Sequence, residues 1–144
     1  MGPSKGRLVA VSTRMILLDT HIVIWLLTAR ERLSGRAHDA ILQARTAGES
    51  LAYSPVSLYE IAYAVHRKRL PLNSPTEDFI AAIQTKLDMV PLTAGIVVCA
   101  AELPDPFHGD PMDRIIAATA IVMDCTLITH DDRIRKANVC KVLW

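Results

Sequence analysis

The chain has little of what would place it among secreted, membrane or zinc-binding proteins. Its three cysteines, Cys99, Cys125 and Cys140, show no paired spacing, which excludes a disulfide framework and a cysteine-rich zinc site and favours a reducing compartment. No apolar run approaches the roughly 18 residues that a membrane-spanning helix needs. The apolar run 8–11 is too short for the core of a signal peptide. We therefore expect a cytoplasmic protein that does not enter a membrane.

Several common catalytic signatures are also missing. The chain has no glycine-rich phosphate loop, no serine nucleophile elbow and no cysteine–histidine couple, which argues against the enzyme classes that depend on them. Its five histidines are too scattered for a zinc site. The formal net charge of +1 neither favours nor excludes a nucleic-acid partner.

Short apolar, β-branched runs alternate with helical patterns along the 144 residues. Strands are expected at 15–18, 51–53, 89–91, 125–129 and 139–142. Helices are expected at 21–29, 33–46, 55–67, 76–87, 94–102 and 111–124. Such alternation predicts an α/β protein with three α/β/α layers around a central, mainly parallel sheet of about five strands.

The length of the chain suits one domain. We expect residues 15–144 to form it and residues 1–14 to be a flexible leader, with Met15 as a candidate for the functional start. Ser54-Pro55 and Asp110-Pro111 each provide a capping side chain followed by proline, which marks the start of a helix. Because helix 111–124 is apolar on nearly every side, we expect it to be central and buried.

Acidic residues stand at the edges of four apolar segments. They are Asp19, Glu60, Asp113 and Asp131. Ligands of open parallel sheets bind beyond the carboxyl ends of the strands, so acids placed there are expected to converge. Two carboxylates about 5 Å apart repel by roughly 3 kcal/mol at an effective dielectric of about 20. A divalent cation removes this cost, and oxygen ligands suit Mg²⁺ or Mn²⁺, so the pattern predicts a site for one or two ions.

Each acid also has a purely structural interpretation. Asp19 is able to cap helix 21–29, and one carboxylate can serve both as cap and as ligand. Glu60 lies three residues after Ser57 on the same helical side, where it borders the core or faces solvent.

The remaining acids are close to other carboxylates in the sequence. Asp110 is expected mainly to cap helix 111–124, with Asp113 as the inward ligand, although both suit a helix N-terminus. One of Asp131 and Asp132 is expected to cap the short helix that follows. Thr129 is placed to hydrogen-bond a carboxylate or a metal-bound water.

Basic residues gather in three segments, 30–36, 66–69 and 133–136. Around an acidic site they would suit a polyanionic substrate, and otherwise they are solvated faces. Arg67, Lys68 and Arg114 are the candidates for holding phosphates of such a substrate, although Arg114 is equally able to pair with an acid.

From Met15 onward the chain resembles the PIN-domain ribonucleases, specifically the VapC-type toxins of bacterial toxin–antitoxin pairs. Four blocks in order carry the resemblance. They are Met15-Ile-Leu-Leu-Asp-Thr-His21, Ser54-Pro-Val-Ser-Leu-Tyr-Glu-Ile61, His108-Gly-Asp-Pro-Met-Asp-Arg-Ile-Ile-Ala-Ala118 and Leu127-Ile-Thr-His-Asp131.

The resemblance implies a PIN-like fold and a Mg²⁺- or Mn²⁺-dependent endoribonuclease whose metal ligands and catalytic residues are the four acids, with Asp131 assisting through water. Ser57 and Thr129 match the polar positions that recur beside these acids in the family, and Asp110 adjoins them. The implied partners are an RNA substrate, a second copy in a homodimer, and a VapB-type antitoxin whose C-terminal segment blocks the groove, with larger toxin–antitoxin assemblies.

Two other functions stay open on the sequence. One is a non-catalytic RNA- or protein-binding domain that keeps only the PIN fold, which intact acids at all four points disfavour. The other is a phospho-acceptor or phosphatase with Asp19 as nucleophile, although the second aspartate that commonly follows two residues later is replaced by His21.

Overall fold

The computed structural model describes residues 14–104 and 109–144. The expected leader therefore lies outside the described residues except for Arg14, and so does His108 of the third sequence block. Within the two described ranges, no helix is long and apolar enough to cross a membrane.

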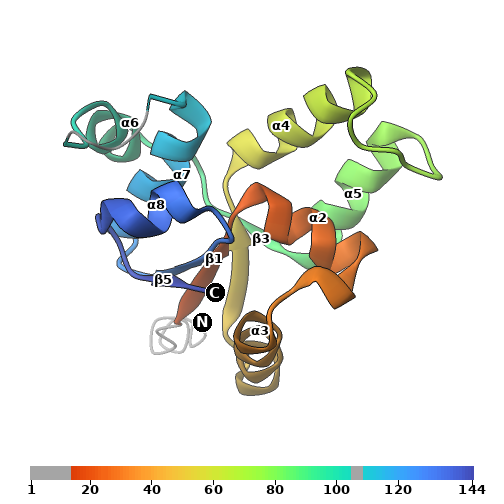
Figure 1. The fold of residues 1–144 in the computed structure, drawn as a ribbon, viewed down its shortest axis with the longest axis horizontal. Coiled ribbons are helices and arrows are strands. Elements are labelled where there is room, and N and C mark those ends of the chain that lie inside the picture. The colour runs from red at the N-terminus through yellow and green to blue at the C-terminus, as the bar shows by residue number, and fades with distance from the viewer. Residues whose placement is uncertain (1–13, 105–108) are drawn as a thin grey trace, which may run out of the picture.

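The described chain contains one sheet of five strands. They are β1 (Met15–Leu18), β2 (Ser50–Tyr53), β3 (Asp88–Met89), β4 (Thr126–Ile128) and β5 (Val142–Leu143). Their order is β3-β2-β1-β4-β5, and every neighbouring pair is parallel (Figure 1). The predicted parallel sheet of about five strands is confirmed.

Helices cover both faces of this sheet, which confirms the three layers. One core contains side chains of α2 (Thr20–Thr28), α3 (Gly35–Ala47), α4 (Pro55–His66) and α5 (Thr76–Lys86), with the short 3₁₀ turn η1 (Arg30–Arg32) between α2 and α3. The other contains those of α6 (Ala94–Ala101), α7 (Pro111–Val122) and α8 (Asp132–Ala137). Helix α4 borders both cores, because Ile61 belongs to the first and Val56 packs against the second.

Strand β1 is central and separates the two cores. Successive side chains of a strand point to opposite faces, so Leu17 enters the core beneath α7 and Leu18 enters the core beneath α2. Both are fully buried. The continuous apolar run before Asp19 is thus explained by a strand that is covered on both sides.

The helix starts follow the sequence signals closely. The Ser54 hydroxyl accepts a hydrogen bond from the Val56 amide at 3.3 Å, and Pro55 follows it at the first helical position. Asp110 caps α7 in the same way. Gly48 ends α3 with φ of 74°, a left-handed conformation that glycine adopts without a steric cost.

The two edge strands are displaced from their predicted positions. Strand β3 is Asp88–Met89 and β5 is Val142–Leu143, whereas the sequence predicted 89–91 and 139–142. Apolar residues that pack against a core without pairing to a strand give the same sequence pattern as a strand. Val139 and Cys140 pack in this way against the core that contains α6, α7 and α8. Pairing to a neighbour, rather than hydrophobicity, decides where a short edge strand begins.

The expectation that the helix at 111–124 is central and buried is confirmed for its middle. Five consecutive residues of helix α7, Ile116 through Ala120, are buried together with Asp113, and five consecutive residues point to every side of a helix. This burial arises because α7 packs against α4 and α6 as well as the sheet. The end of the helix is not covered in this single chain, where Ile121 and Val122 are 36% and 46% exposed.

Candidate active site

The candidate site lies at the carboxyl ends of β1 and β4. The chain passes from β1 through β2 to β3 on one side and returns to β4 and β5 on the other, so the strand order reverses between β1 and β4. Ligands of open α/β sheets bind at such switch points. Asp19 follows β1 directly, and the segment from Thr129 to Asp131 follows β4.

Asp19 is both a helix cap and a cleft-lining acid. Its Oδ1 accepts a hydrogen bond from the Thr20 amide at 2.8 Å, which caps α2. Its Oδ2 accepts one from the Thr129 hydroxyl at 2.7 Å. Only 6% of the residue is exposed, yet it lines a cleft at the surface of the described chain. The capping interpretation of Asp19 is confirmed, and its role as a metal ligand stays a prediction.

Thr129 joins the ends of β1 and β4. It is fully buried, donates to Asp19 and accepts from the Asp131 amide at 3.0 Å. The expectation that Thr129 bonds a carboxylate is confirmed. The arrangement holds the carboxylate of Asp19 in one orientation at the edge of the sheet.

A buried hydroxyl that the sequence did not single out connects α2 with α4. The Thr20 hydroxyl lies 2.8 Å from the Ser57 hydroxyl and donates to Glu60 Oε1 at 2.5 Å. Because a threonine hydroxyl has one proton to give, Ser57 is the donor in the first contact. Ser57 and Thr20 thus position Glu60. The only sequence signal for this role of Thr20 is that it directly follows Asp19.

Helix α7 contributes two aspartates with different surroundings. Asp110 is exposed, and its Oδ1 accepts from the amides of Met112 at 2.9 Å and Asp113 at 3.3 Å. It is the cap that the sequence predicted. Asp113 is buried and faces inward, as expected.

Asp131 caps α8 and is held by an arginine. Its Oδ1 accepts from the amides of Arg133 at 2.7 Å and Ile134 at 3.3 Å, and its Oδ2 from the Arg133 guanidinium at 3.2 Å. The same guanidinium lies 3.7 Å from Asp113 Oδ2. Arg133 therefore bridges two of the acids. The sequence placed it in a basic cluster without indicating this contact.

The acids influence one another's protonation. Burial raises the pKa of Glu60 to about 7, and the negative charges of Asp113, Asp19 and Asp110 add to this rise against the hydrogen bond from Thr20. Burial likewise raises the pKa of Asp19, with a further contribution from Asp113.

Asp131 differs from these two acids. Burial raises its pKa, but the hydrogen bonds from the side chain and backbone of Arg133 and from the Ile134 backbone outweigh this and lower it below its usual value. The carboxylates that line the cleft thus include two that resist ionisation and one that stays charged.

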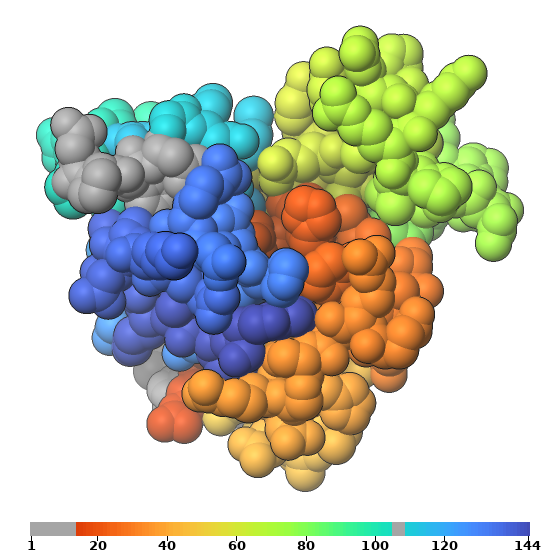
Figure 2. Space-filling view, viewed as in Figure 1, coloured from red at the N-terminus to blue at the C-terminus, as the bar shows by residue number. Residues whose placement is uncertain are grey.

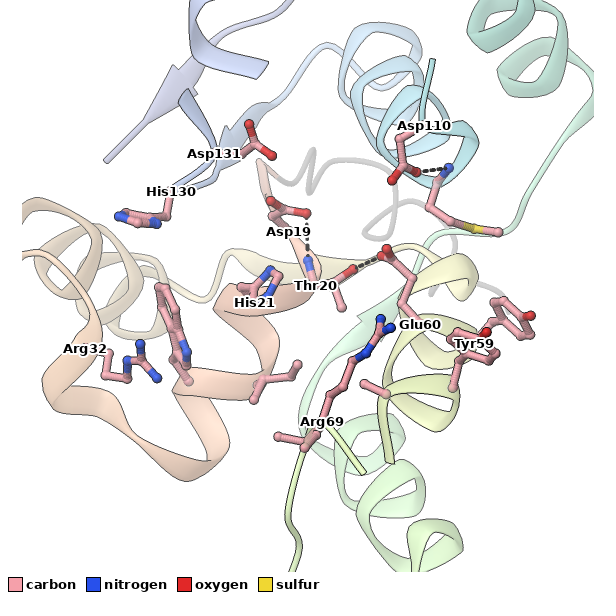
Figure 3. A pocket seen from close by; sticks show the side chains of 16 residues that line it. Asp19, Thr20, His21, Arg32, Tyr59, Glu60, Arg69, Asp110, His130 and Asp131 are labelled. Atoms are coloured by element: carbon pink, nitrogen blue, oxygen red, sulfur yellow. Dashed lines mark hydrogen bonds between the residues drawn. The ribbon is translucent and has the colours of Figure 1, made fainter. Parts of the chain in front are cut away.

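A cleft of about 820 Å³ opens above these residues (Figure 3). Figure 2 shows a hollow between the α4–α5 region and the part that carries α7 and α8, with the start of α2 at its base. The acids that line it are Asp19, Glu60, Asp110 and Asp131. Among the described residues, Asp113 and Ser57 are not part of the lining, and no three histidine, cysteine, aspartate or glutamate side chains are grouped as a ready-made metal site.

The basic residues around the cleft are not the ones chosen from the sequence. Arg32 and Arg69 line it, and Figure 3 shows Arg69 reaching toward Glu60. Arg67 instead packs over the Tyr63 ring at 5.9 Å. Two of the three basic segments nevertheless supply a residue to the cleft wall.

Arg114 is held away from the cleft by the end of α6. Its guanidinium donates to the carbonyl oxygens of Ala100 and Leu103, each at 3.0 Å. Exposed Lys68 has φ of 57° and is not among the described residues that line the cleft.

A parallel α/β sheet with acids gathered at its switch point defines a class of protein. Comparison of the chain with known protein families identifies that class. The model of the PIN domain family matches residues 16–139. The chain belongs to this family, as the resemblance of its four sequence blocks indicated.

Individual relatives agree with this assignment. The chain is 34% identical over 120 residues to Ribonuclease VapC22 of Mycobacterium tuberculosis, which covers 83% of this chain and 89% of that protein. In fold the protein is similar to a chain of VapBC2 from Rickettsia felis bound to a promoter DNA fragment, with a TM-score of 0.69 and 16% sequence identity. The match covers 90% of this chain and 97% of that chain. A chain of DNA-bound VapBC from Salmonella typhimurium gives a TM-score of 0.67 at 13% identity, with coverage of 91% and 98%.

Proposed function

We propose that residues 15–144 act as one nuclease domain, a Mg²⁺- or Mn²⁺-dependent endoribonuclease that serves as the toxin of a toxin–antitoxin pair. The observation that carries this is the cleft at the sheet switch point, where burial raises the pKa of both Asp19 and Glu60 and the negative charge of Asp19 adds to the rise at Glu60. The similarity to a protein named as a ribonuclease over most of both chains supports the choice of RNA.

The carboxylates suit a divalent metal ion. Asp19, Glu60 and Asp113 offer only oxygen ligands, and their mutual repulsion is the cost that a cation removes. Asp131 assists through water. Mg²⁺ keeps several of its waters when bound, so acids standing apart across a cleft remain compatible with it. When bound, such an ion lowers the pKa of water and neutralises charge on a phosphate.

The protein's own groups orient these acids and the substrate. Thr129 holds Asp19, and the Ser57–Thr20 chain holds Glu60, so both carboxylates keep their direction when RNA arrives. Arg32 and Arg69 on the cleft walls replace Arg67, Lys68 and Arg114 as the residues proposed to hold RNA phosphates.

We further propose a homodimer and a VapB-type antitoxin as partners, with larger assemblies of the two. The support is the similarity in fold to chains from VapBC complexes. The exposed apolar residues on neighbouring α6 and α7 offer a surface that association would bury. They are Val97, Val98, Ile121 and Val122, followed by Met123.

The test is to induce the protein in bacterial cells and map the new RNA ends. Wild type should arrest growth and cut RNA, whereas Asp19→Asn and Glu60→Gln should lose both effects. The matched control is Asp132→Asn, because Asp132 is an exposed acid beside Asp131 that pairs with Arg135. Unchanged cleavage by Asp19→Asn would exclude the proposed site.

Purified protein separates this function from a non-catalytic binding domain. Calorimetric titration with Mn²⁺ should show a site in wild type that Asp19→Asn weakens strongly. A domain that retains only the fold would bind RNA equally well with and without Mn²⁺. It would leave the RNA uncut.

A further inference from the structure

Helix α4 carries a stack of flat side chains along one side of the cleft. Tyr59, Tyr63 and Arg67 are four residues apart, a spacing that places them on one face of a helix. The two tyrosine rings are stacked, with 5.9 Å between centroids and 20° between planes. The Arg67 guanidinium lies 5.9 Å from the Tyr63 ring, so the stack continues to a cation.

This stack is open to solvent at the Tyr59 end. Tyr59 is 59% exposed and Tyr63 is 44% exposed, so two adjacent rings present a contiguous surface to solvent, and such surfaces mark sites for ligands or partners. Tyr63 is placed between Tyr59 and Arg67. The free ring surface at this end of the stack therefore belongs to Tyr59.

The open end is next to the acids. Both tyrosines line the same cleft as Asp19 and Glu60, and Tyr59 precedes Glu60 in the chain. Figure 3 shows Tyr59 and Glu60 on the same helix, with Arg69 beside Glu60. Ring surface and positive charge thus both line this cleft.

That combination matches the chemistry of an unpaired nucleotide. Bases stack on aromatic rings and on arginine planes, while phosphates seek positive charge. A purely apolar partner segment would not use Arg67 and Arg69, whose charges would stay solvated at the rim. The charges on this wall favour a polyanion.

We propose that Tyr59 is a base-stacking subsite for an unpaired nucleobase of the RNA substrate, with Tyr63 and Arg67 supporting its ring from behind. The subsite rests on the ribonuclease function proposed above. It fixes one nucleotide beside the acids, so it decides which phosphate is presented to them.

The experiment measures RNA binding by fluorescence anisotropy in the full-length Asp19→Asn protein, which should not cut the probe. The probe is a fluorescein-labelled pool of random-sequence, single-stranded oligoribonucleotides. Tyr59→Ala should bind it about tenfold more weakly, the order expected for the loss of one base–aromatic stack. Tyr59→Phe, which keeps the ring, should bind as tightly as the parent. The matched control is His66→Ala, because His66 is an exposed residue of the same helix outside the cleft lining.

A second probe separates stacking from a loss of structure. An abasic ribose-phosphate oligomer of equal length should bind equally to the parent and to Tyr59→Ala, because it has no base to stack. The proposal is overturned if Tyr59→Ala binds RNA as tightly as Tyr59→Phe, if its defect persists with the abasic oligomer, or if the parent does not bind the pool. Failure of the proposed ribonuclease function would give a different result. In that case the wild-type protein would not cut RNA in the presence of Mn²⁺.

Discussion

At the scale of single residues, the site depends on carboxylates whose oxygens are only partly satisfied. Asp19 accepts one hydrogen bond at each oxygen, from the Thr20 amide and the Thr129 hydroxyl. A carboxylate offers about four lone-pair positions, so capacity remains on both oxygens. This explains how a buried acid can cap a helix and still be available to a cation.

Glu60 should make the metal-free protein less stable as the pH rises. Its pKa is about 7 in the folded protein, above the ordinary 4.5. Between these values the folded state holds a proton that the unfolded state has released, so the free energy of unfolding falls with pH and the full cost is present above pH 7. The variant Glu60→Gln should lose this dependence.

Thermal unfolding in a chelator, at several values between about pH 5 and pH 8, checks this. The midpoint of wild type relative to Glu60→Gln should fall across the window. Glu77→Gln, an exposed change in the first turn of α5, should behave as wild type. Parallel curves for wild type and Glu60→Gln would contradict the prediction.

At the scale of elements, the acids stand where helices begin. Asp19, Asp110 and Asp131 each cap a helix, and Asp113 lies in the first turn of α7. The amides and dipole of a helix N-terminus favour a negative charge. The capping interactions therefore stabilise carboxylates at the same edge of the sheet where they line the cleft.

Substitutions of Asp131 separate capping from charge. Asp131→Ala removes the cap of α8 and should lower the free energy of unfolding by about 1 kcal/mol. Asp131→Asn can still cap the helix and should be close to wild type in denaturant unfolding, yet both variants should cut RNA more slowly if the charge assists the metal. Full activity in Asp131→Asn would limit this residue to capping.

At the scale of the whole molecule, the cleft joins segments that are far apart in the chain. The starts of α2, α7 and α8 meet the middle of α4 there, and the Arg133 guanidinium already links Asp113 with Asp131 across two of these elements. An ion held between them would bind the folded protein and not the unfolded chain. Its binding free energy then adds to the stability of the entire fold.

Mn²⁺ should therefore raise the thermal unfolding midpoint of wild type. At a hundredfold excess over the dissociation constant the gain is about 2.7 kcal/mol. Asp19→Asn should show little shift, and Asp132→Asn should keep the wild-type response. An equal shift in Asp19→Asn would place the bound ion elsewhere.

Local signals in the sequence were sufficient for much of the fold. The doubly buried strand before Asp19, the Ser54-Pro55 and Asp110-Pro111 helix starts and the parallel alternation all appear as predicted. The edge strands and the exposed end of α7 did not follow, since a strand boundary depends on a partner and the burial of a helix turn depends on what packs around it.

The sequence by itself determined which acids stand at strand and helix ends, because capping and strand termination act between neighbouring residues. Only the tertiary structure decided what surrounds them. It brought Thr20 against Ser57 and Glu60, placed Arg133 between Asp113 and Asp131, and pointed Arg69 rather than Arg67 into the cleft. These contacts join residues from different elements, so their geometry is set by how the helices pack on the sheet.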